Sequence, residues 1–253
     1  MLKGIYYGNF GGIGGSGGEI VKSDTPPSDV DKFWFNTKDF NFYIYDTEKE
    51  KWYKNGVIPP LPVTLDILED GSCDSLFQFE DNLNDDGGVL TANYNSSIAY
   101  VTGINGKGVS FDPNNTPNSY VKIKKSDPLY LTFWAYLNNS NNNNKYLLDN
   151  RSDELAGTSY VYYTTSLHNS GLNKITTLHD DNKTDVPINT WVFFYVEITA
   201  SCNGVGFGNY TRNPGSGYSM NGIIDQVRVF NRALSDTDIS NVFKAEKTKF
   251  LGR

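Results

Sequence analysis

Cysteine, histidine and long apolar runs are scarce in this sequence, and each shortage excludes a class of protein. Only 2 Cys and 2 His occur among the 253 residues. Two cysteines are too few for a disulfide scaffold, and His168 and His179 have no cysteine or acid cluster at zinc-ligand spacing. No run of about 18 apolar residues is present, so we expect no membrane insertion. Glycines interrupt the N-terminal stretch, so we expect no secretory signal and synthesis in a cytoplasm.

The two cysteines, Cys73 and Cys202, fall near the ends of predicted strands. They either form one disulfide or remain two small buried thiols. Synthesis in a reducing compartment favours the thiols.

Positive charge is also in short supply. The chain carries 22 Lys and Arg against 29 Asp and Glu, a formal net charge of −7. Nucleic-acid binding needs a positive surface, so this balance argues against DNA or RNA as a partner. The basic run at 122–125 (KIKK) is either a local basic patch or, as we prefer, the solvated end of an edge strand, where lysines block unwanted pairing.

Aromatic residues, by contrast, are abundant, with 17 Tyr and 15 Phe, and they favour β-strands. Apolar or aromatic runs bounded by turn residues predict many short strands. The predicted strands cover residues 76–80, 105–111, 129–137, 160–164, 174–178, 191–199, 205–210 and 222–230. Residues 129–137 are apolar on both faces and predict a central strand. The pattern predicts an all-β fold, an antiparallel β-sandwich with a short C-terminal helix.

Composition divides the chain into four segments. They are a Gly-rich arm at 1–20, a small aromatic unit with a Pro-rich connector at 21–62, the sandwich at 63–246 and a tail at 247–253.

The arm carries four large side chains that we expect to anchor it, namely Ile5, Tyr6, Tyr7 and Phe10. A Gly-rich chain does not order by itself. Large side chains spaced through it fit a segment that threads into a partner and orders on binding. The alternative is a disordered tail.

The second segment contains three aromatic runs, at 32–36, 40–46 and 52–54, separated by turn-like residues. They predict a three-stranded β-meander, which is too small to be stable unless another surface covers one face. Its order of Pro-Pro, Phe-Trp-Phe-Asn-Thr, Tyr-Ile-Tyr-Asp and Trp resembles a short module of tailed-phage virion proteins.

The most distinctive segment is residues 220–240, MNGIIDQVRVFNRALSDTDIS. Val227 and Val229 alternate with polar residues, which predicts a half-buried strand. Ser235 precedes a helical run and Asp238 follows three residues later, which is the spacing of a capping box. We expect a closing strand that leads into a capped helix.

This segment resembles the last strand and helix of laminin-G-like domains in the concanavalin A-like lectin and glucanase superfamily. The residues that carry the resemblance are Ile224, Asp225, Val227, Arg228, Val229, Phe230, Asn231, Arg232, Ala233, Leu234 and Ser235. Earlier steps of the family pattern appear at Phe77, Phe79, Asp81, Asn82, Leu83, Asp85 and Gly88, at Gly103, Gly106, Gly108, Val109 and Phe111, at 131–134 (LTFW), and at Asn189 and Trp191. The resemblance implies a jelly-roll sandwich over residues 63–246. One rim hairpin of the family has no room before Asn203 and Gly204.

Carboxylates suited to catalysis are not evident. Enzymes with this sandwich usually place several carboxylates on one strand face. Here Glu197 stands alone in its predicted strand, and Asp81, Asp85 and Asp86 fall in a loop, where acids commonly form solvated turns. We therefore predict a protein that is not an enzyme and needs no cofactor.

A structural calcium ion is the one metal for which the sequence offers ligands. Loop carboxylates and amides are the hard oxygen donors that calcium prefers. The resemblance implies that Asp225 would hold the ion with Asp81 and Asn82 near the first strand. The alternative is that Asp225 forms hydrogen bonds with the backbone or with Arg228.

Several tyrosines fall in or beside predicted strands and loops that could form a sugar-binding rim, namely Tyr160, Tyr162, Tyr163, Tyr210 and Tyr218. Sugars stack on aromatic faces and exchange hydrogen bonds with polar side chains. Tyrosines in strands are also ordinary core residues. The sequence leaves both interpretations open.

These patterns favour a non-enzymatic structural or adhesive protein of a tailed-phage virion, either a head decoration or fibre or a tail-fibre component. We expect the arm to bind other virion proteins and the sandwich to project outward and contact a host-surface glycan, with a homotrimer as one option for assembly. The alternatives are a bacterial surface or secreted carbohydrate-binding module and a divergent glycan hydrolase.

Overall fold

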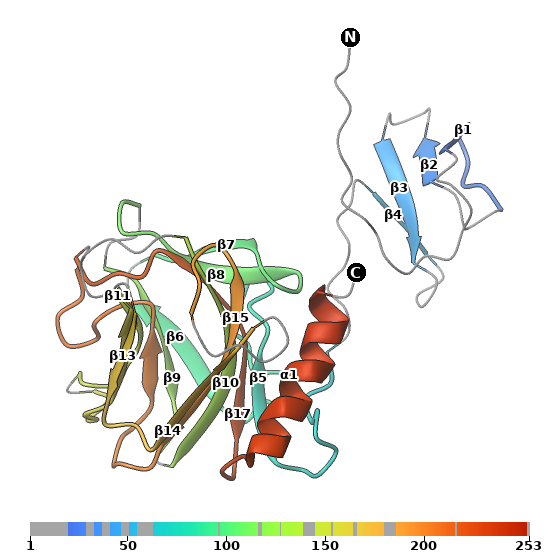
Figure 1. Cartoon of the computed structure of the whole chain (residues 1–253). Coiled ribbons are helices and arrows are strands. Elements are labelled where there is room, and N and C mark those ends of the chain that lie inside the picture. Colours follow the sequence, from blue (N-terminus) through green and yellow to red (C-terminus); the bar gives the residue numbers. More distant parts are fainter. Residues whose placement is uncertain are drawn as a thin grey trace. The chain divides into compact units, whose positions relative to one another are not determined.

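The chain forms two compact units, seen in the computed structural model of Figure 1. One unit comprises Met1–Leu61 with Leu251–Arg253, and the other comprises Pro62–Phe250. The structure describes residues 20–28, 33–36, 41–46, 51–54, 63–95, 97–115, 118–126, 128–138, 145–152, 154–163, 166–179, 186–215 and 217–251. The predicted anchoring residues Ile5, Tyr6, Tyr7 and Phe10 lie outside the described residues.

The first unit contains one small sheet with the strand order β1-β2-β3-β4. Its strands are β1 (Ile20–Ser23), β2 (Phe33–Asn36), β3 (Asn41–Asp46) and β4 (Lys51–Lys54). Strands β2, β3 and β4 pair antiparallel, as the predicted meander requires. The sequence did not predict β1, which pairs parallel with β2. Trp34 is buried, and its ring centroid lies 4.5 Å from that of Tyr43.

In the described part of the chain, the second unit is a sandwich of two antiparallel sheets with one helix. The seven-stranded sheet has the order β14-β15-β10-β17-β8-β7, with β5 also paired to β17. Its strands are β5 (Cys73–Phe77), β7 (Ala99–Thr102), β8 (Lys107–Phe111), β10 (Leu129–Leu137), β14 (Lys174–Leu178), β15 (Trp191–Ile198) and β17 (Gly222–Phe230). Because β10 lies between β15 and β17, its prediction as a central strand is confirmed.

The six-stranded sheet has the order β13-β12-β11-β16-β9-β6. Its strands are β6 (Thr91–Asn95), β9 (Tyr120–Lys124), β11 (Lys145–Asp149), β12 (Tyr160–Tyr163), β13 (Leu167–Ser170) and β16 (Val205–Phe207). All of its strand pairs are antiparallel, as are those of the seven-stranded sheet. The predicted fold class, an all-β antiparallel sandwich with a short C-terminal helix, is confirmed.

The main core lies between the two sheets and follows from strand alternation. Leu131, Phe133 and Ala135 point from β10 into this core. The Phe133 ring stacks on Phe194 at 5.0 Å and meets the edge-on ring of Phe207 from the other sheet at 5.2 Å. Aromatic contacts of this kind join the two layers without polar groups.

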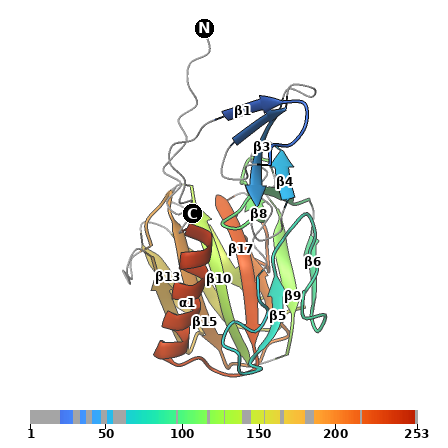
Figure 2. The same ribbon diagram turned by 90° about the vertical axis from the view of Figure 1, so that its right-hand side faces the viewer.

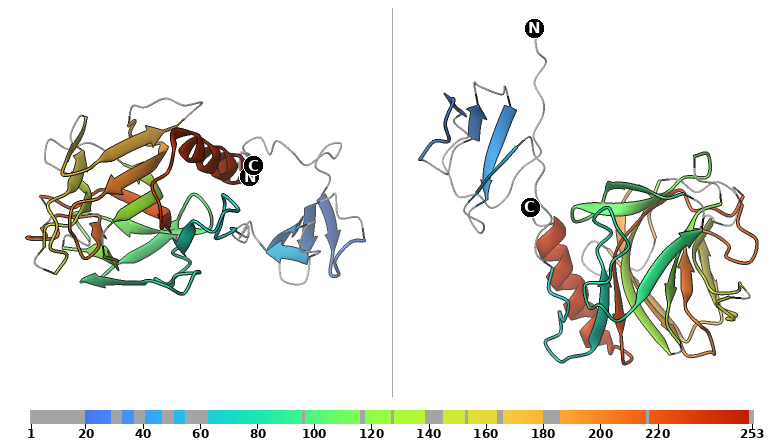
Figure 3. Two further views of the ribbon diagram at one scale, coloured as in Figure 1. Left: turned by 90° about the horizontal axis from the view of Figure 1, so that it is seen from below. Right: turned by 180° about the vertical axis from the view of Figure 1, so that it is seen from behind.

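The C-terminal helix, α1 (Asp236–Leu251), packs on the outer face of the seven-stranded sheet. A second apolar cluster forms there, in which Trp134 contacts Phe193 and Phe243 with ring centroids 5.5 and 5.8 Å away. Figure 2 shows α1 alongside β10 and β15. In Figures 1 and 3 the helix and strands β11 to β13 lie on opposite sides of the sandwich.

A buried ion pair holds the helix to this sheet. Arg228 on β17 donates from Nε to Glu246 on α1 at 2.7 Å, and both side chains are at most 1% exposed. The other carboxylate oxygen of Glu246 accepts the Trp134 indole N–H at 2.7 Å. Arg228 Nη1 also donates to the carbonyls of Thr64 and Leu65. Strand β17 is thus buried on both faces, because α1 covers the face that carries the polar residues. The prediction that this strand is half-buried was therefore wrong.

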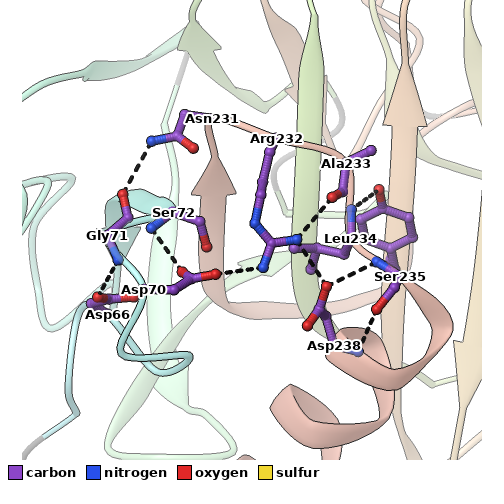
Figure 4. A network of polar contacts seen from close by, with 11 residues as sticks. Asp66, Asp70, Gly71, Ser72, Asn231, Arg232, Ala233, Leu234, Ser235 and Asp238 are labelled. Atoms are coloured by element: carbon purple, nitrogen blue, oxygen red, sulfur yellow. Dashed lines mark hydrogen bonds and ion pairs between the residues drawn. The ribbon is translucent and has the colours of Figure 1, made fainter.

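The loop between β17 and α1 is held by the polar network in Figure 4. Asp238 N–H donates to Ser235 Oγ at 3.1 Å, while Ser235 N–H donates to Asp238 Oδ2 at 3.0 Å, which confirms the predicted capping box. Arg232 joins this cap to an earlier loop by pairing with Asp238 at 2.8 Å and with Asp70 at 2.5 Å. Hydrogen bonds from Ser72 and from Arg232 lower the pKa of Asp70 to about 2.

The structure corrects the interpretation of the basic run and decides between the two alternatives for the cysteines. The basic run at 122–125 does not end an edge strand, because β9 lies between β16 and β6. The cysteines are two free buried thiols. Cys73 packs in the cluster beneath α1 and Cys202 in the core between the sheets, so the two lie on opposite faces of the seven-stranded sheet.

Candidate functional site

Asp225, the first residue of the calcium hypothesis, has its carboxylate surrounded by backbone N–H groups. Gln226, at a φ of 51°, sits in an irregularity of the β10–β17 pairing, next to the fully buried Asp225. Asp225 Oδ2 accepts the backbone N–H of Ile104 at 2.9 Å and of Asn105 at 3.2 Å, and Oδ1 accepts that of Gln226 at 2.6 Å. A Cβ at Gly103 would lie 2.3 Å from Asp225 Oδ2, so this approach requires glycine. Burial raises the pKa of Asp225, against the opposing effect of these N–H donors.

The other two residues of the calcium hypothesis face different partners. Asp81 Oδ2 lies 2.5 Å from the Lys107 ammonium. Asn82 donates to the Glu80 carbonyl at 2.7 Å and accepts the Asn84 N–H at 2.8 Å. Calcium requires oxygens that converge on the ion, whereas these oxygens face N–H donors and an ammonium group, so the arrangement does not fit the ion. Among the described residues, no group of three or more His, Cys, Asp or Glu could hold a metal. Calcium binding stays a prediction.

A second set of predicted residues does come together, on the outer face of the six-stranded sheet. On β12, Val161 and Tyr163 point into the core, so Tyr160 and Tyr162 point outward. Both outward tyrosines are partly exposed, and their ring centroids lie 5.8 Å apart. Tyr163, which the sequence grouped with them, is instead a core residue.

Tyr146 on β11 is the centre of this group, which we call the tyrosine face and define as Tyr146, Tyr160, Tyr162, Tyr210 and Tyr218. The Tyr146 ring centroid lies 6.0, 5.4, 5.4 and 6.0 Å from those of Tyr160, Tyr162, Tyr210 and Tyr218, in that order. The register of β11 against β12 shifts between Tyr146 and Leu148, so strict alternation does not apply along β11. Tyr146 is 6% exposed and Tyr218 is 39% exposed, so the face has a buried centre and an open rim.

An arginine is embedded in the tyrosine face. The guanidinium carbon of Arg151 lies 4.0, 4.6 and 5.0 Å from the ring centroids of Tyr160, Tyr210 and Tyr146, each within cation–π range. Arg151 Nε donates to Asp149 Oδ1 at 2.5 Å. Burial disfavours the charged form, but contacts with Tyr146 and Asp149 outweigh this effect and raise the pKa of Arg151.

Asp149 and Thr211 fix the base of the face. Asp149 is fully buried, and its Oδ2 accepts the Thr211 backbone N–H at 2.8 Å as well as the Thr211 hydroxyl. This bond ties the loop that follows β16, and with it Tyr210, to the end of β11. A Cβ at Gly206 would lie 2.3 Å from Thr211 Cγ2, so the loop packs directly on β16.

Basic side chains lie on the same sheet beyond β16. Strand β9 carries Lys122 and Lys124, and both pair with Glu154. Val121 and Ile123 point into the core, so the two lysines share the outer face with the tyrosines. The outer face therefore has an aromatic half on β11 to β13 and a basic part on β9.

The sequence found four of the five tyrosines but not the residues that organise them. Tyr160, Tyr162, Tyr210 and Tyr218 were considered either as rim residues or as core residues, and they do gather on one face. Tyr146 and Arg151 carried no pattern of their own. His168, which the sequence analysis considered only with regard to zinc, lies on β13 and stacks on Tyr162 with ring centroids 4.9 Å apart.

Comparison with known proteins identifies no family. No protein-family model and no curated protein sequence matches the chain significantly. One similar solved structure is domain 4 of AbnA, an extracellular GH43 arabinanase from Geobacillus stearothermophilus, in complex with arabinotriose. It is 13% identical to this chain, and the match covers 68% of this chain and 98% of that domain with a TM-score of 0.46.

Two toxin domains match this chain with similar sequence identities and TM-scores. The binding domain of Paraclostridial Mosquitocidal Protein 1 is 14% identical over 69% of this chain and 52% of that one, with a TM-score of 0.46. The receptor binding domain of botulinum neurotoxin type G is 16% identical over 69% of this chain and 51% of that one, with a TM-score of 0.45. The present chain thus spans about half the length of these toxin domains.

Within the described part of the chain, no helix has the length and apolar character needed to cross a membrane.

Proposed function

We propose that this chain is a non-enzymatic adhesive protein whose sandwich binds carbohydrate through the tyrosine face. The observation that carries the proposal is the gathering of Tyr160, Tyr162, Tyr210 and Tyr218 around Tyr146 on one sheet face, with Arg151 against three of these rings. Helix α1 covers the opposite sheet and leaves this face to solvent (Figure 3).

The chemistry of the face suits sugars. The C–H faces of a pyranose ring stack on aromatic rings, and sugar hydroxyls exchange hydrogen bonds with phenol, guanidinium and ammonium groups. The rings are held before any ligand arrives, because Tyr146 and Arg151 contact most of them. A preformed surface loses little conformational entropy on binding.

Binding rather than cleavage is the activity that the carboxylates of this face favour. A glycosidase needs two carboxyl groups that flank the scissile bond. Asp149 is fully buried and engaged by Thr211 and Arg151, and Glu154 is paired with two lysines. Neither is arranged as a free acid or base.

The glycan-binding proposal is tested with the full chain on an array of immobilised polysaccharides. The double variant Tyr210→Ala with Tyr218→Ala should reduce retention on the glycans that the unmodified chain binds by about tenfold or more, since each ring offers a stacking surface. Tyr94→Ala is the matched control, because Tyr94 is 52% exposed on β6 but does not belong to the tyrosine face. Retention unchanged by the double variant, or no retention on any glycan, would contradict the proposal.

The setting in a tailed-phage virion is the second part of the proposal and rests on the sequence. The supporting features are the large side chains in the Gly-rich arm, the phage-like aromatic unit and the laminin-G-like pattern of the sandwich. We propose that the arm binds other virion proteins, and that assembly is as a homotrimer, with the glycan on the host surface. A bacterial carbohydrate-binding module is the alternative.

Virion attachment is tested by mixing particles stripped of this protein with the full chain or with a version lacking residues 1–62. Binding by the full chain alone is the expected result. Equal binding by both versions would exclude the arm as the anchor. Binding by neither, combined with retention on a glycan, would favour the bacterial module.

A further inference from the structure

We infer that the glycan is anionic and that Arg151 is the residue that recognises its charge. This inference rests on the proposed function and narrows it to polysaccharides that carry carboxylate groups. It is based on the charges of the outer face, on the state of Arg151 and on a second arginine of the same chain that serves as an internal reference.

The charge of the outer face is opposite in sign to that of the whole chain. The chain has a net charge of −7. On this face, by contrast, the side chains of Arg151, Lys122 and Lys124 are 22, 12 and 46% exposed. Against them stand Glu154, which is 42% exposed, and Asp149, which is fully buried. Of these five side chains, three cations and one anion therefore reach solvent, so an anionic ligand meets more positive than negative charge among them, although the whole chain is acidic.

Arg151 has hydrogen-bonding capacity that the protein does not use. Its Nε donates to Asp149, whereas its Nη2 has no hydrogen-bond partner and is covered by neighbouring atoms. The rings of Tyr160, Tyr210 and Tyr146 replace part of the water around the guanidinium, so its charge is less screened than in bulk solvent and attracts a carboxylate on the ligand.

Arg228 shows how this chain treats an arginine that only stabilises the fold. It is fully buried, its Nε donates to Glu246 at 2.7 Å and its Nη1 donates to two backbone carbonyls, while its Nη2, like that of Arg151, has no hydrogen-bond partner. Arg151 instead sits at an open face, and three tyrosines contact its guanidinium plane. This orientation keeps the cation in place while leaving the face free for a ligand.

The test compares acidic polysaccharides with the same polymers after their carboxyl groups have been reduced to alcohols. The probes are polygalacturonate, alginate, hyaluronate and polysialate, each beside its reduced form, with the full chain as the binder. At least one acidic polymer should bind, and its reduced form should bind about tenfold or more weakly. Affinity for the acidic form should also fall as sodium chloride rises from 50 to 500 mM, values chosen to shorten the Debye length from about 14 to about 4 Å.

The outcomes separate the two proposals. Equal binding of acidic and reduced polymers, or binding of neutral glycans alone, would overturn the anionic inference and leave carbohydrate binding intact. No binding to any acidic, reduced or neutral polymer would overturn both.

Variants test the assignment of Arg151 itself. Arg151→Gln should weaken binding of the acidic polymer by about tenfold, while Arg151→Lys keeps part of the affinity because it keeps the charge. Lys244→Gln, an exposed change of the same charge on α1, should bind normally. Full affinity in Arg151→Gln would overturn the assignment. So would a loss of affinity for reduced and acidic forms alike, because Arg151 would then only position the tyrosines.

Discussion

The two sheets of the sandwich are built from the same alternating strands, but their outer faces differ. On the seven-stranded sheet the outward residues, Trp134, Phe193 and Arg228 among them, lie under helix α1. On the six-stranded sheet the outward residues are tyrosines, an arginine and lysines, and all of those named except Tyr146 remain at least partly exposed. Each face contains an arginine–carboxylate pair, and only the pair under the helix is closed to solvent on both sides.

This difference separates stability from recognition within one domain. Burial of an apolar face together with a solvent-excluded ion pair stabilises the fold and leaves no exposed group for a ligand. An open face of rings around a partly paired cation adds less to stability and offers chemistry to a partner. The four predictions below would break or sharpen this contrast, in order of expected effect.

The largest effect should come from Glu246→Ala. The change leaves Arg228 buried without its carboxylate and Trp134 without its acceptor, so we expect a loss of about 3–5 kcal/mol in the free energy of unfolding. Chemical denaturation measures it. Lys244→Ala on the same helix should have little effect. A double change, Arg228→Met with Glu246→Leu, should lose much less than Glu246→Ala, because it removes both charges.

Adjacent residues on β12 give the sharpest contrast between the faces. Tyr163→Ala opens the core and should cost about 3 kcal/mol of stability. Tyr162→Ala should leave stability nearly unchanged and instead weaken glycan binding by about tenfold. Thermal melting and glycan affinity are measured on both variants. Equal effects on both properties would show that the two faces do not divide these roles.

Loss of the helix cap should have an intermediate effect. Ser235→Ala removes the acceptor for the Asp238 N–H, and we expect a loss of about 1 kcal/mol in stability. Thr237→Ala, an exposed change in the first turn, is the control. Glycan binding should be the same in both variants, since the cap lies on the helix side of the sandwich. A binding defect in Ser235→Ala would argue against independent faces.

The smallest effect should be a pH-dependent one at Asp70. The pKa of Asp70 is about 2 in the fold against an ordinary value of 3.8, so its ionised form stabilises the protein above pH 4. This contribution is lost as the pH falls from about 4 to about 2. Asp70→Asn should therefore lower the melting temperature slightly at pH 7, and the difference should vanish near pH 2. A difference that stays constant with pH would mean that Arg232 does not act through the Asp70 charge.

Much of the fold followed from local pattern. Residues 129–137, 174–178 and 222–230 matched β10, β14 and β17, because long or strongly alternating apolar runs have few other solutions. The capping box followed from two side chains three residues apart. Strands β6, β7, β11 and β13 were not predicted, because their short polar or mixed sequences become strands only when neighbours supply hydrogen bonds.

The candidate site divides in the same way. The tyrosines of β12 were visible as a run, but the sequence could not say which of them faced inward. Tyr146 escaped notice because the β11 register shifts beside it. The calcium hypothesis for Asp81, Asn82 and Asp225 followed a family pattern, whereas the structure gives each side chain a different partner.

By itself the sequence determined the all-β class, the central strands, the capped closing helix and the shortage of positive charge that argues against nucleic acid. These properties depend on composition and on spacing over a few residues. Only the tertiary structure decided that β17 is covered on both faces and that five tyrosines gather with Arg151 on one face. Those contacts join residues from β11, β12 and the loop after β16, which are separated along the chain by up to 72 residues. Strand pairing brings them together, and no local pattern records that pairing.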